Sequence, residues 1–527
     1  MTAGAIVGGP LATSGGRWAL GLFLVLGHLA LTLGLSSGLG RDELESMLFA
    51  QGWAWGYDVE QPPLYNWLQM AVTEAVGPSL AGSILLRWGI IVVGVLALYD
   101  AVRRMAGGDA ALAAGALAGV GGTALFGFEG ARHFTHTTLL LTATALILWT
   151  AVRVVERPGA GRFVALGAAL AVGALSKYTI AVFVLALGLA ALAEPATRAA
   201  LLDRRVLWAA VAPLLAVPGH LIWRLGQDSS LTERVASITS RGEPVGWLEA
   251  MPGLLLNVVA DPIAGMAPPL VLALALVPWR RVWGGRAEPT PGTPRWDRVL
   301  LVYVAAAMAL TLAVVLASGG HRLRYHYLMP AALVMPAIPL LWMRARGLTL
   351  APWRRRALGW GLVGLALVLL AGTAVHRAWI EPAGCGRCLP LLPADRAAEA
   401  VRAAGFSDGT IVAASLDWGA NLRPAFPEAR MLARHYPHWR PPGRPPGGVP
   451  GAGACLILLS PREAAALRDG ALEADPIATT LTGMVGAAPP EGWLSSVTVR
   501  DLPLTLAPDR SVSFAFHLSP EGLGTCR

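Results

Sequence analysis

Residues 18–37 read WALGLFLVLGHLALTLGLSS, and the charged stretch RDELE follows them at residues 41–45. A run of about 20 apolar residues is long enough to cross the hydrocarbon core of a bilayer. The sequence therefore predicts a membrane-spanning helix that ends beside a cluster of charged side chains. A second acidic stretch, YDVEQPPLY at residues 57–65, follows on the same predicted loop.

The composition of the whole chain extends this prediction to a polytopic α-helical membrane protein. The chain has 527 residues, of which 55% are hydrophobic and only 14% are charged. A soluble protein of this length carries far more charge. About eleven transmembrane helices are expected, at 18–37, 81–99, 109–127, 137–152, 163–176, 178–194, 206–223, 252–278, 299–317, 326–343 and 357–376.

The arginines fall in alternate loops, which predicts the orientation of the chain. Positively charged loops stay on the cytoplasmic side of a membrane. The N-terminus is then inside, and the acidic loop and the C-terminal segment are outside. The net charge of +9 is explained by this topology, and no nucleic-acid partner is expected. The arginines on the inner side are 17, 103, 104, 153, 157, 162, 198, 204, 205, 280, 281, 286, 295, 298, 344, 346 and 354–356.

The segment 380–527 differs from the rest, because it is richer in Pro, Gly and charge and has no membrane-length apolar run. We expect two domains: a transmembrane domain at 1–379, whose first outer loop 38–80 carries the acidic motif, and a soluble outer domain at 380–527. Helical spacing at 394–404 and apolar β-type stretches predict a small α/β domain. The predicted strands are 411–415, 455–459, 497–502 and 512–517, and a Pro/Gly-rich loop covers 441–453.

All four cysteines lie in this C-terminal segment, at positions 385, 388, 455 and 526. An oxidising compartment favours disulfides, and four cysteines allow three pairings, between which the sequence does not choose. Cys385 and Cys388 have the spacing of a redox or metal motif, but neither a histidine nor a second such pair accompanies them. We expect a structural clasp.

Five acidic residues lie in the two charged stretches of the first outer loop, at 41–45 and 57–65: Asp42, Glu43, Glu45, Asp58 and Glu60. An ionised carboxylate beside a bilayer loses hydration unless a cation, a metal or a water-filled cleft compensates it. The loop therefore suggests a functional site. The alternative is a solvated loop whose charges only mark the membrane surface.

Cations are expected on the same outer side. Lysine and arginine together number 42, yet Lys177 is the only lysine, and it separates two apolar runs. A compact ammonium binds phosphate as a point charge, whereas a guanidinium imposes a planar fork. Arg322, Arg324 and Tyr325 precede another apolar run and would suit an anionic head group. The alternatives are a snorkelling lysine and an ordinary interfacial belt of Tyr and Arg.

A third outer turn carries Arg132, His133 and His136. Two histidines three residues apart can share one face of a helix and bind a metal or a phosphate. Without a carboxylate partner in the motif, polar packing within the turn is the competing interpretation.

Together these residues suit the transfer of a group from a lipid-linked phosphate to a hydroxyl or amine. A carboxylate would accept the proton of the acceptor as general base. Lys177, Arg322 and Arg324 would stabilise the negative charge on the departing phosphate.

The chain also resembles bacterial members of glycosyltransferase family 39, which are integral-membrane enzymes of the GT-C fold related to aminoarabinose transferases and protein O-mannosyltransferases. The resemblance covers roughly residues 15–345. It rests on Asp42-Glu43 after the first membrane helix, on PPLYNWL at 62–68, on Lys177-Tyr178 and on Arg324-Tyr325.

The resemblance implies a multi-pass protein of a bacterial inner membrane with its C-terminal domain in the periplasm. It implies a polyprenyl-phosphate sugar donor, inversion at the anomeric carbon, and a lipid, glycan or protein acceptor. Asp42 would be the general base, with Glu43 as its neighbour in the motif. The donor phosphate would be bound by Lys177, Arg322, Arg324 and Tyr325, and substrate by Glu60, Gln61, Arg132, His133, His136 and Tyr178.

This chain departs from the family at two places. Gln61 stands where the aminoarabinose transferases carry a phosphate-contacting lysine, and His136-Thr137 stands where many relatives carry an acidic residue. Because Gln61 cannot neutralise a phosphate, Lys177 and the Arg322/Arg324 pair would carry more of the donor's charge. The identity of the sugar and of the acceptor stays open.

Two further questions stay open at this point. No cofactor is certain, although a divalent cation is possible, with Asp42, Glu43, Glu60 and His133 as candidate ligands.

A transporter or flippase for a lipid-linked saccharide is the alternative function. Such a protein is expected to show inverted repeats or paired broken helices, and the two halves of the sequence show no such symmetry.

Overall fold

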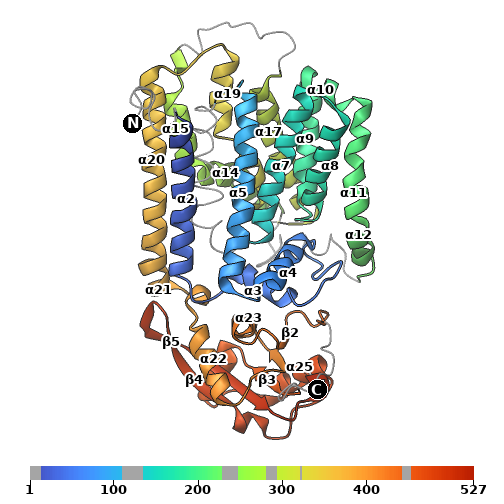
Figure 1. Cartoon of the computed structure of the whole chain (residues 1–527), viewed down its shortest axis with the longest axis vertical. Coiled ribbons are helices and arrows are strands. Elements are labelled where there is room, and N and C mark those ends of the chain that lie inside the picture. Colours follow the sequence, from blue (N-terminus) through green and yellow to red (C-terminus); the bar gives the residue numbers. More distant parts are fainter. Residues whose placement is uncertain are drawn as a thin grey trace. The chain divides into compact units, whose positions relative to one another are not determined.

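The computed structural model describes residues 13–109, 134–227, 247–280, 294–320, 323, 325–441 and 453–526. The chain divides into two compact units. The helical unit comprises Met1–His28, Val59–Leu64 and Trp88–Thr373. The sheet unit comprises Leu29–Asp58, Tyr65–Arg87 and Ala374–Arg527. Most of the acidic loop therefore belongs to the sheet unit, while its segment Val59–Leu64 belongs to the helical unit. Figure 1 labels the helices and strands of both units.

The helical unit consists of apolar helices. Among the described residues, five helices are long and apolar enough to cross a membrane, or up to eight if each bent helix pair is one span. The helices between residues 14 and 375 are α2 Ser14–Gly34, α3 Arg41–Phe49, α4 Leu64–Val76, α5 Leu80–Met105, α7 His136–Glu156, α8 Ala160–Ala174, α9 Ile180–Ala193, α10 Pro195–Leu201, η2 Arg204–Ala210, α11 Val211–Ala216, α12 Pro218–Leu225, α14 Trp247–Gly265, α15 Ala267–Leu276, α17 Trp296–Ala317, η3 Tyr325–Tyr327, α18 Met329–Ala332, α19 Ala337–Ala345 and α20 Pro352–Val375.

Helices occur at ten of the eleven apolar runs, and the remaining run, 109–127, falls almost wholly outside the described residues. Two of the predicted spans are bent, by 54° before α12 and by 72° between α14 and α15, and the chain also turns by 119° between α9 and α10, at the end of the predicted span 178–194. A proline stands at or near the start of the second helix in each pair, where it lacks the N–H that would continue the preceding helix. The number of crossings and their orientation stay predictions.

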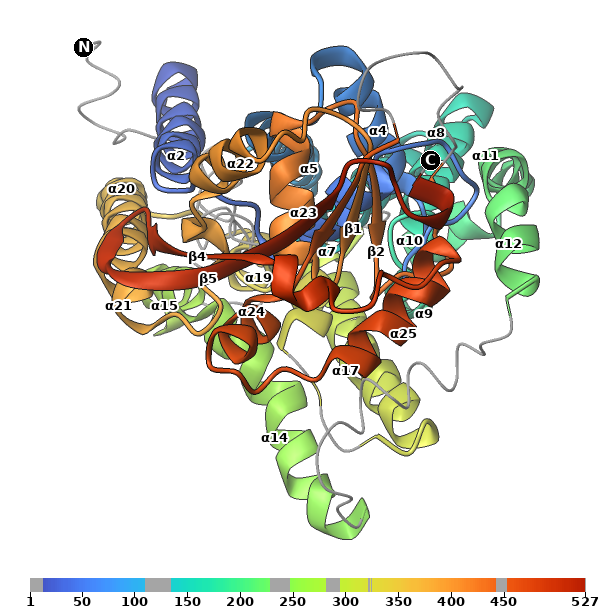
Figure 2. The same cartoon turned by 90° about the horizontal axis from the view of Figure 1, so that it is seen from below.

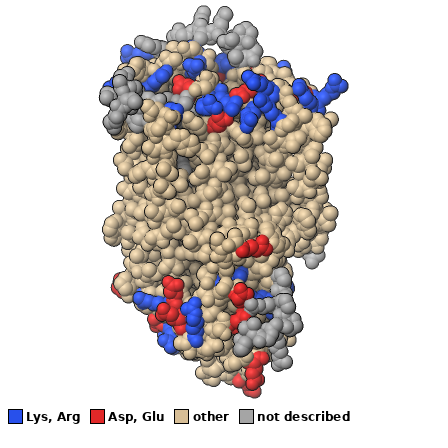
Figure 3. Space-filling view, in the orientation of Figure 1, with Lys and Arg blue, Asp and Glu red and all other residues tan. Residues whose placement is uncertain are grey.

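Small residues allow the helices of this unit to approach closely. A side chain at Gly167 of α8 would place its Cβ 2.3 Å from the carbonyl oxygen of Ala209, so only glycine fits there. Thr142 of α7 donates a hydrogen bond to the Ile90 carbonyl of α5 at 2.9 Å. Both features are typical of helices that pack in a membrane. Figure 3 shows arginines gathered at one end of this unit, next to a wide band of surface without charged side chains.

The sheet unit is built around a five-stranded sheet in the order β2-β1-β3-β5-β4. The central strand β1 pairs in parallel with β2 and β3, and β5 pairs antiparallel with β3 and β4. The strands are β1 Thr410–Ala413, β2 Arg430–Ala433, β3 Cys455–Leu458, β4 Thr498–Leu504 and β5 Ala507–Ser519. Four of them lie at predicted strands, while β2 was not predicted.

Helices cover both faces of this sheet (Figure 2). Side chains alternate along a strand. Ile411 of β1 therefore packs in the core that includes α22 (Ala394–Ala403) and α23 (Leu416–Leu422), and Val412 packs in the core that includes α25 (Ala474–Val485). The remaining short elements are η4 His376–Ile380, α21 Glu381–Gly384, η5 Leu389–Leu391, α22 Ala394–Ala403, α23 Leu416–Leu422, η6 Arg423–Ala425, α24 Pro461–Arg468, α25 Ala474–Val485, η7 Trp493–Ser496 and η8 Gly524–Cys526.

Two disulfides resolve the pairing that the sequence left open. Cys385 is bonded to Cys388, and Cys455 is bonded to Cys526. The first bond closes the Cys-Gly-Arg-Cys turn, as expected of a structural clasp. The second fastens η8 to β3, at the end of the described chain.

Candidate functional site

The acidic stretch of the first loop forms helix α3, whose first turn contains Asp42 and Glu43. Carboxylates are favourable there, because the backbone N–H groups of a helix N-terminus are unpaired and carry partial positive charge. Glu43 is almost fully buried and uses both of its oxygens. One accepts the Gly40 backbone N–H at 2.7 Å, and the other accepts from the Arg87 guanidinium at 2.6 Å.

Asp42 has different surroundings from its neighbour. Its side chain is partly exposed, and the hydroxyl of Ser46 donates to its backbone carbonyl at 3.1 Å. Of the two adjacent carboxylates, Glu43 is held inside the fold by an ion pair, whereas Asp42 is open to solvent in part. Of these two carboxylates, Asp42 is therefore the one that a molecule in solution can reach.

Glu45 is a third carboxylate of this helix, and it was not predicted as a site residue. Burial raises the pKa of Glu45 to about 8, and the nearby negative charges of Asp42 and Asp58 act in the same direction. A hydrogen bond with Tyr436 opposes the shift. The three-residue spacing of Asp42 and Glu45 puts both residues on one face of a helix. This spacing could have indicated Glu45 as a site residue from the sequence alone. Tyr436 could not be found in this way, because it is far away in the sequence.

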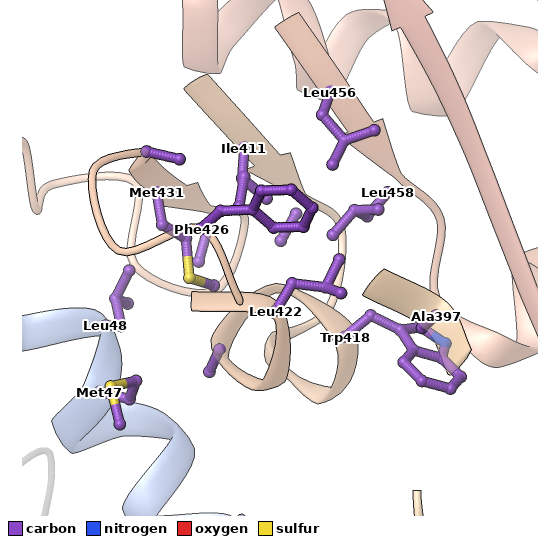
Figure 4. Packing of buried hydrophobic residues seen from close by; sticks show 14 of the residues in the cluster. Met47, Leu48, Ala397, Ile411, Trp418, Leu422, Phe426, Met431, Leu456 and Leu458 are labelled. Carbon is purple, nitrogen blue, oxygen red and sulfur yellow. The ribbon is translucent and has the colours of Figure 1, made fainter. Parts of the chain in front are cut away.

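Helix α3 is anchored in the core of the sheet unit. Its apolar residues follow helical spacing and belong to the same core as Trp418, Leu422 and Met431 (Figure 4). Burial of one such side chain contributes about 1.5–3 kcal/mol. The α3 residues in this core are Leu44, Met47, Leu48 and Phe49.

Hydrogen bonds fix the position of the same helix. The Gln51 side chain donates to the Met431 carbonyl at 3.0 Å and accepts the Met431 N–H at 2.7 Å, and thus satisfies backbone groups of β2. Before the helix, the Leu39 N–H donates to the Asn421 side chain at 2.8 Å. Arg423, whose pKa burial lowers to about 10, donates to the Met47 carbonyl at 3.3 Å. The backbone around Asp42 is therefore held by side chains of the C-terminal segment.

In the helical unit, Lys177 lies at the turn between α8 and α9. Its ammonium donates to the Thr137 hydroxyl at 3.0 Å and lies 5.9 Å from the centre of the Tyr327 ring. A cation over an aromatic face is stabilised by the ring quadrupole. The structure therefore brings Lys177 together with the start of α7 and with the segment that follows Arg324.

The segment Val59–Leu64 joins this group. The Leu64 N–H donates to the Leu175 carbonyl at 3.1 Å, which ties the Pro62-Pro63 segment to the turn that carries Lys177. The buried Oε1 atom of Gln61 has no hydrogen-bond partner among the described residues. Glu60 is partly exposed. A buried polar atom without a protein partner needs an explanation, such as an ordered water or an ion.

Two histidines lie nearby in the helical unit. His136 is buried at the N-terminus of α7, where its Nδ1 atom is 3.1 Å from the Thr135 hydroxyl. Tyr178 lies 2.9 Å from Nε2 of His220, and the two rings are stacked. His220 was not predicted, because a single buried histidine in an apolar run gives no pattern.

Some predicted residues cannot be placed. Arg132, His133, Arg322, Arg324 and the side chain of Tyr325 lie outside the described residues. The others fall into two groups. The helical unit holds Glu60, Gln61, His136, Lys177 and Tyr178, and the sheet unit holds Asp42 and Glu43.

The candidate metal ligands do not form a cluster within the described parts of the chain. No group of three or more His, Cys, Asp or Glu side chains there has the geometry to hold a metal ion. Glu43 fits such a role poorly, because the Arg87 guanidinium and the Gly40 N–H already occupy its oxygens.

Comparisons with known proteins give consistent matches. Residues 60–223 match the family described as dolichyl-phosphate-mannose-protein mannosyltransferase. The lipopolysaccharide core galacturonosyltransferase RgtA of Rhizobium johnstonii is 29% identical over 433 residues, which cover 79% of this chain and 82% of the relative. RgtB, of the same description and organism, is 27% identical over 342 residues, which cover 64% of this chain and 67% of the relative.

Solved structures with the same fold include ArnT from Cupriavidus metallidurans. The crystal structure bound to undecaprenyl phosphate superimposes with a TM-score of 0.60 at 14% identity, over 95% of this chain and 98% of the other. The apo structure gives a TM-score of 0.57 with the same identity and coverage. At this level of identity the likeness establishes the fold.

Proposed function

We propose that this chain, which is a membrane glycosyltransferase of the GT-C class, transfers a sugar from a polyprenyl-phosphate donor to an acceptor at the outer face of the inner membrane. The donor class is supported by the undecaprenyl phosphate named for ArnT. The names of RgtA and RgtB make galacturonic acid the first sugar to test and a lipopolysaccharide core the first acceptor.

In the proposed reaction Asp42 is the general base. The acceptor hydroxyl loses its proton to the Asp42 carboxylate as its oxygen bonds to the anomeric carbon of the sugar. The bond between that carbon and the phosphate oxygen breaks, and the polyprenyl phosphate leaves with the bonding electrons. Attack opposite to the leaving group inverts the anomeric configuration. A positioned base typically contributes about 10²–10⁴-fold to the rate.

Lys177 is proposed to stabilise the leaving phosphate. Negative charge grows on the phosphate oxygens as the bond breaks, and a fixed ammonium lowers the barrier most when it is already in position. Thr137 and the Tyr327 ring hold the Lys177 ammonium in place. Gln61 lies on the segment that is tied to the turn of Lys177, and the N–H groups of its side-chain amide are proposed to donate a hydrogen bond to the donor phosphate.

The assignment of Asp42 as the base rests on the difference between its surroundings and those of Glu43. An ion pair with Arg87 and a hydrogen bond from Gly40 make Glu43 part of the fold. Asp42, one residue earlier, keeps a partly exposed side chain on a helix whose position is fixed on its other faces. A base must reach its substrate and must also be held still.

A transfer assay with defined donors tests this proposal. The full chain would be reconstituted in vesicles with a panel of polyprenyl-phosphate sugars and a lipopolysaccharide core acceptor. We expect a glycosylated product whose anomeric configuration is opposite to that of the donor. Retained configuration would contradict direct displacement. Movement of the lipid-linked sugar across the vesicle membrane without any product would instead support the flippase alternative.

A further inference from the structure

A basic cavity lies in the helical unit, at the end of the unit where arginines gather (Figure 3). It has a volume of about 490 Å³. Its walls are formed by the C-terminal ends of α5 and α7 and the first turn of α8. The lining residues are Arg104, Arg153, Glu156, Arg157 and Arg162.

One side of the cavity is formed by Arg104, which belongs to a hydrogen-bond network around Asp100. Asp100 accepts hydrogen bonds from Arg103, from Arg104 at 2.6 Å and from the Trp149 indole at 2.8 Å. Arg104 also donates to Glu156 at 2.7 Å. The network fixes the Arg104 guanidinium at the wall of the cavity.

The other side of the cavity carries Arg153, Arg157 and Arg162. Arg153 contacts an aromatic ring and Arg162 contacts backbone carbonyls, and neither kind of contact neutralises a guanidinium. The Arg153 guanidinium stacks 4.6 Å from the centre of the Trp149 ring. Arg162 donates to the carbonyls of Arg153 and Arg157 at 2.8 and 3.0 Å, where α7 ends. Among the described residues, Glu156 is the only carboxylate that lines the cavity, against four arginines. Counting Arg103 and Asp100 as well, the group keeps an excess of three positive charges.

The position of the cavity indicates where its ligand comes from. Helices α5 and α7 are both long and apolar enough to cross a membrane, and the cavity lies where both end. The charged side chains border a band of the helical unit without charges (Figure 3). The cavity therefore lies at the depth of lipid head groups.

We propose that this cavity binds the phosphate of an anionic phospholipid head group. A guanidinium donates two parallel hydrogen bonds to phosphate oxygens, and several arginines fixed around one space suit a single anion. The excess of positive charge favours a head group with net negative charge, such as phosphatidylglycerol, over zwitterionic phosphatidylcholine. This site is separate from the proposed transfer reaction and does not depend on it.

An ordinary belt of arginines predicts a different behaviour. Arginines at helix C-termini also compensate the helix dipole and mark one side of the membrane. Such a belt would interact with anionic membranes diffusely, so that no single arginine would matter more than another. A defined cavity predicts that arginines lining it matter and that an exposed arginine elsewhere does not.

The test is lipid binding by the purified full chain, measured by native mass spectrometry after exchange into mixed micelles with phosphatidylglycerol or phosphatidylcholine. The test variants are Arg157→Gln and the double variant Arg153→Gln/Arg157→Gln. The control is Arg198→Gln, an exposed arginine outside the cavity. Near a membrane surface each arginine contributes about 1 kcal/mol to anionic binding, which corresponds to roughly fivefold in affinity.

We expect wild type and Arg198→Gln to retain phosphatidylglycerol in preference to phosphatidylcholine. Binding should fall about fivefold in the single variant and about 25-fold in the double variant. Melting temperatures in lipid-free detergent show whether the variants are folded. Equal retention of the two lipids, or an equal loss in the control, would overturn the proposal. Displacement of the lipid by inorganic phosphate at millimolar concentration would identify a soluble anion as the ligand and would overturn it as well.

Discussion

Asp42 and Glu43 are neighbours in the sequence and have the same charge, but the fold uses them differently. Glu43 is buried in an ion pair with Arg87 and stabilises the start of α3. Asp42 is partly exposed. The sequence identified both as candidates because the motif holds both. The resemblance assigned the role of base to Asp42, but the structural role of Glu43 could not be predicted, since its partner Arg87 lies 44 residues further along the chain.

Lys177 is the residue at which the proposed donor contact can be tested. Lys177→Arg keeps the charge but replaces a compact ammonium by a planar fork, which cannot occupy the same space between Thr137 and the Tyr327 ring. We expect a raised KM for the donor and an unchanged KM for the acceptor in steady-state assays. If both constants match the wild type, Lys177 is a snorkelling lysine.

Glu45 predicts a pH dependence of stability. Its pKa is raised from 4.5 to about 8 in the fold, mainly by burial, so the folded chain holds a proton that the unfolded chain releases. The stabilisation is complete below the unfolded pKa and is lost as the pH rises through the folded value. We expect the Tm to fall between about pH 4.5 and 8, and this fall should be smaller in Glu45→Gln. Identical pH profiles for the two proteins would contradict this role.

At the scale of elements, the apolar runs predicted the positions of the helices. They did not predict the short strand β2 or the bend after α9. Runs of about 20 apolar residues leave few alternatives to a helix in a membrane. Strand β2 was missed because it has only four residues and begins with Arg430. The break after α9 was not predicted as a bend, because a bend depends on packing as well as on proline.

The attachment of α3 was not visible in the sequence either. Its partners Asn421, Arg423 and Met431 lie far along the chain and carry no motif. The helical spacing of Leu44, Met47 and Leu48 indicates one apolar face but not what covers it. Only the three-dimensional structure shows that the core of the sheet unit does so.

Gln51→Ala tests whether this attachment positions Asp42. The change removes two hydrogen bonds to Met431 and leaves buried backbone groups unpaired, at a cost of about 1–3 kcal/mol. We expect a lower Tm. We also expect kcat to decrease by a larger factor than the KM for the donor increases. Gln227→Ala is the matched control, because its amide bonds within its own helix end. Loss of stability with an unchanged kcat would show that Gln51 is purely structural.

At the scale of the whole molecule, the chain divides differently from the way its composition changes. The composition changes near residue 380, and we expected the acidic loop to belong with the transmembrane part. The compact units instead place Leu29–Asp58 together with Ala374–Arg527. An apolar core shared by distant segments cannot be read from local composition.

Removal of residues 380–527 is the corresponding experiment. If the C-terminal segment only recognised the acceptor, the truncated chain would still transfer sugar to some acceptors. Because α3 loses the core that covers its apolar face, we expect loss of transfer to every acceptor and faster proteolysis within residues 38–58. A truncated chain with normal rates and unchanged acceptor choice would show that the segment supports neither function.

The most direct test of the proposed reaction compares the initial rates of sugar transfer by wild type, Asp42→Asn and Asp469→Asn in the same vesicles. Asp469 is an exposed carboxylate of the sheet unit and controls for the loss of one charge. We expect Asp42→Asn to be slower by about 10²–10⁴-fold with an unchanged Tm, and Asp469→Asn to match the wild type. A folded Asp42→Asn protein that transfers sugar at the wild-type rate would contradict the assignment of Asp42 as the base.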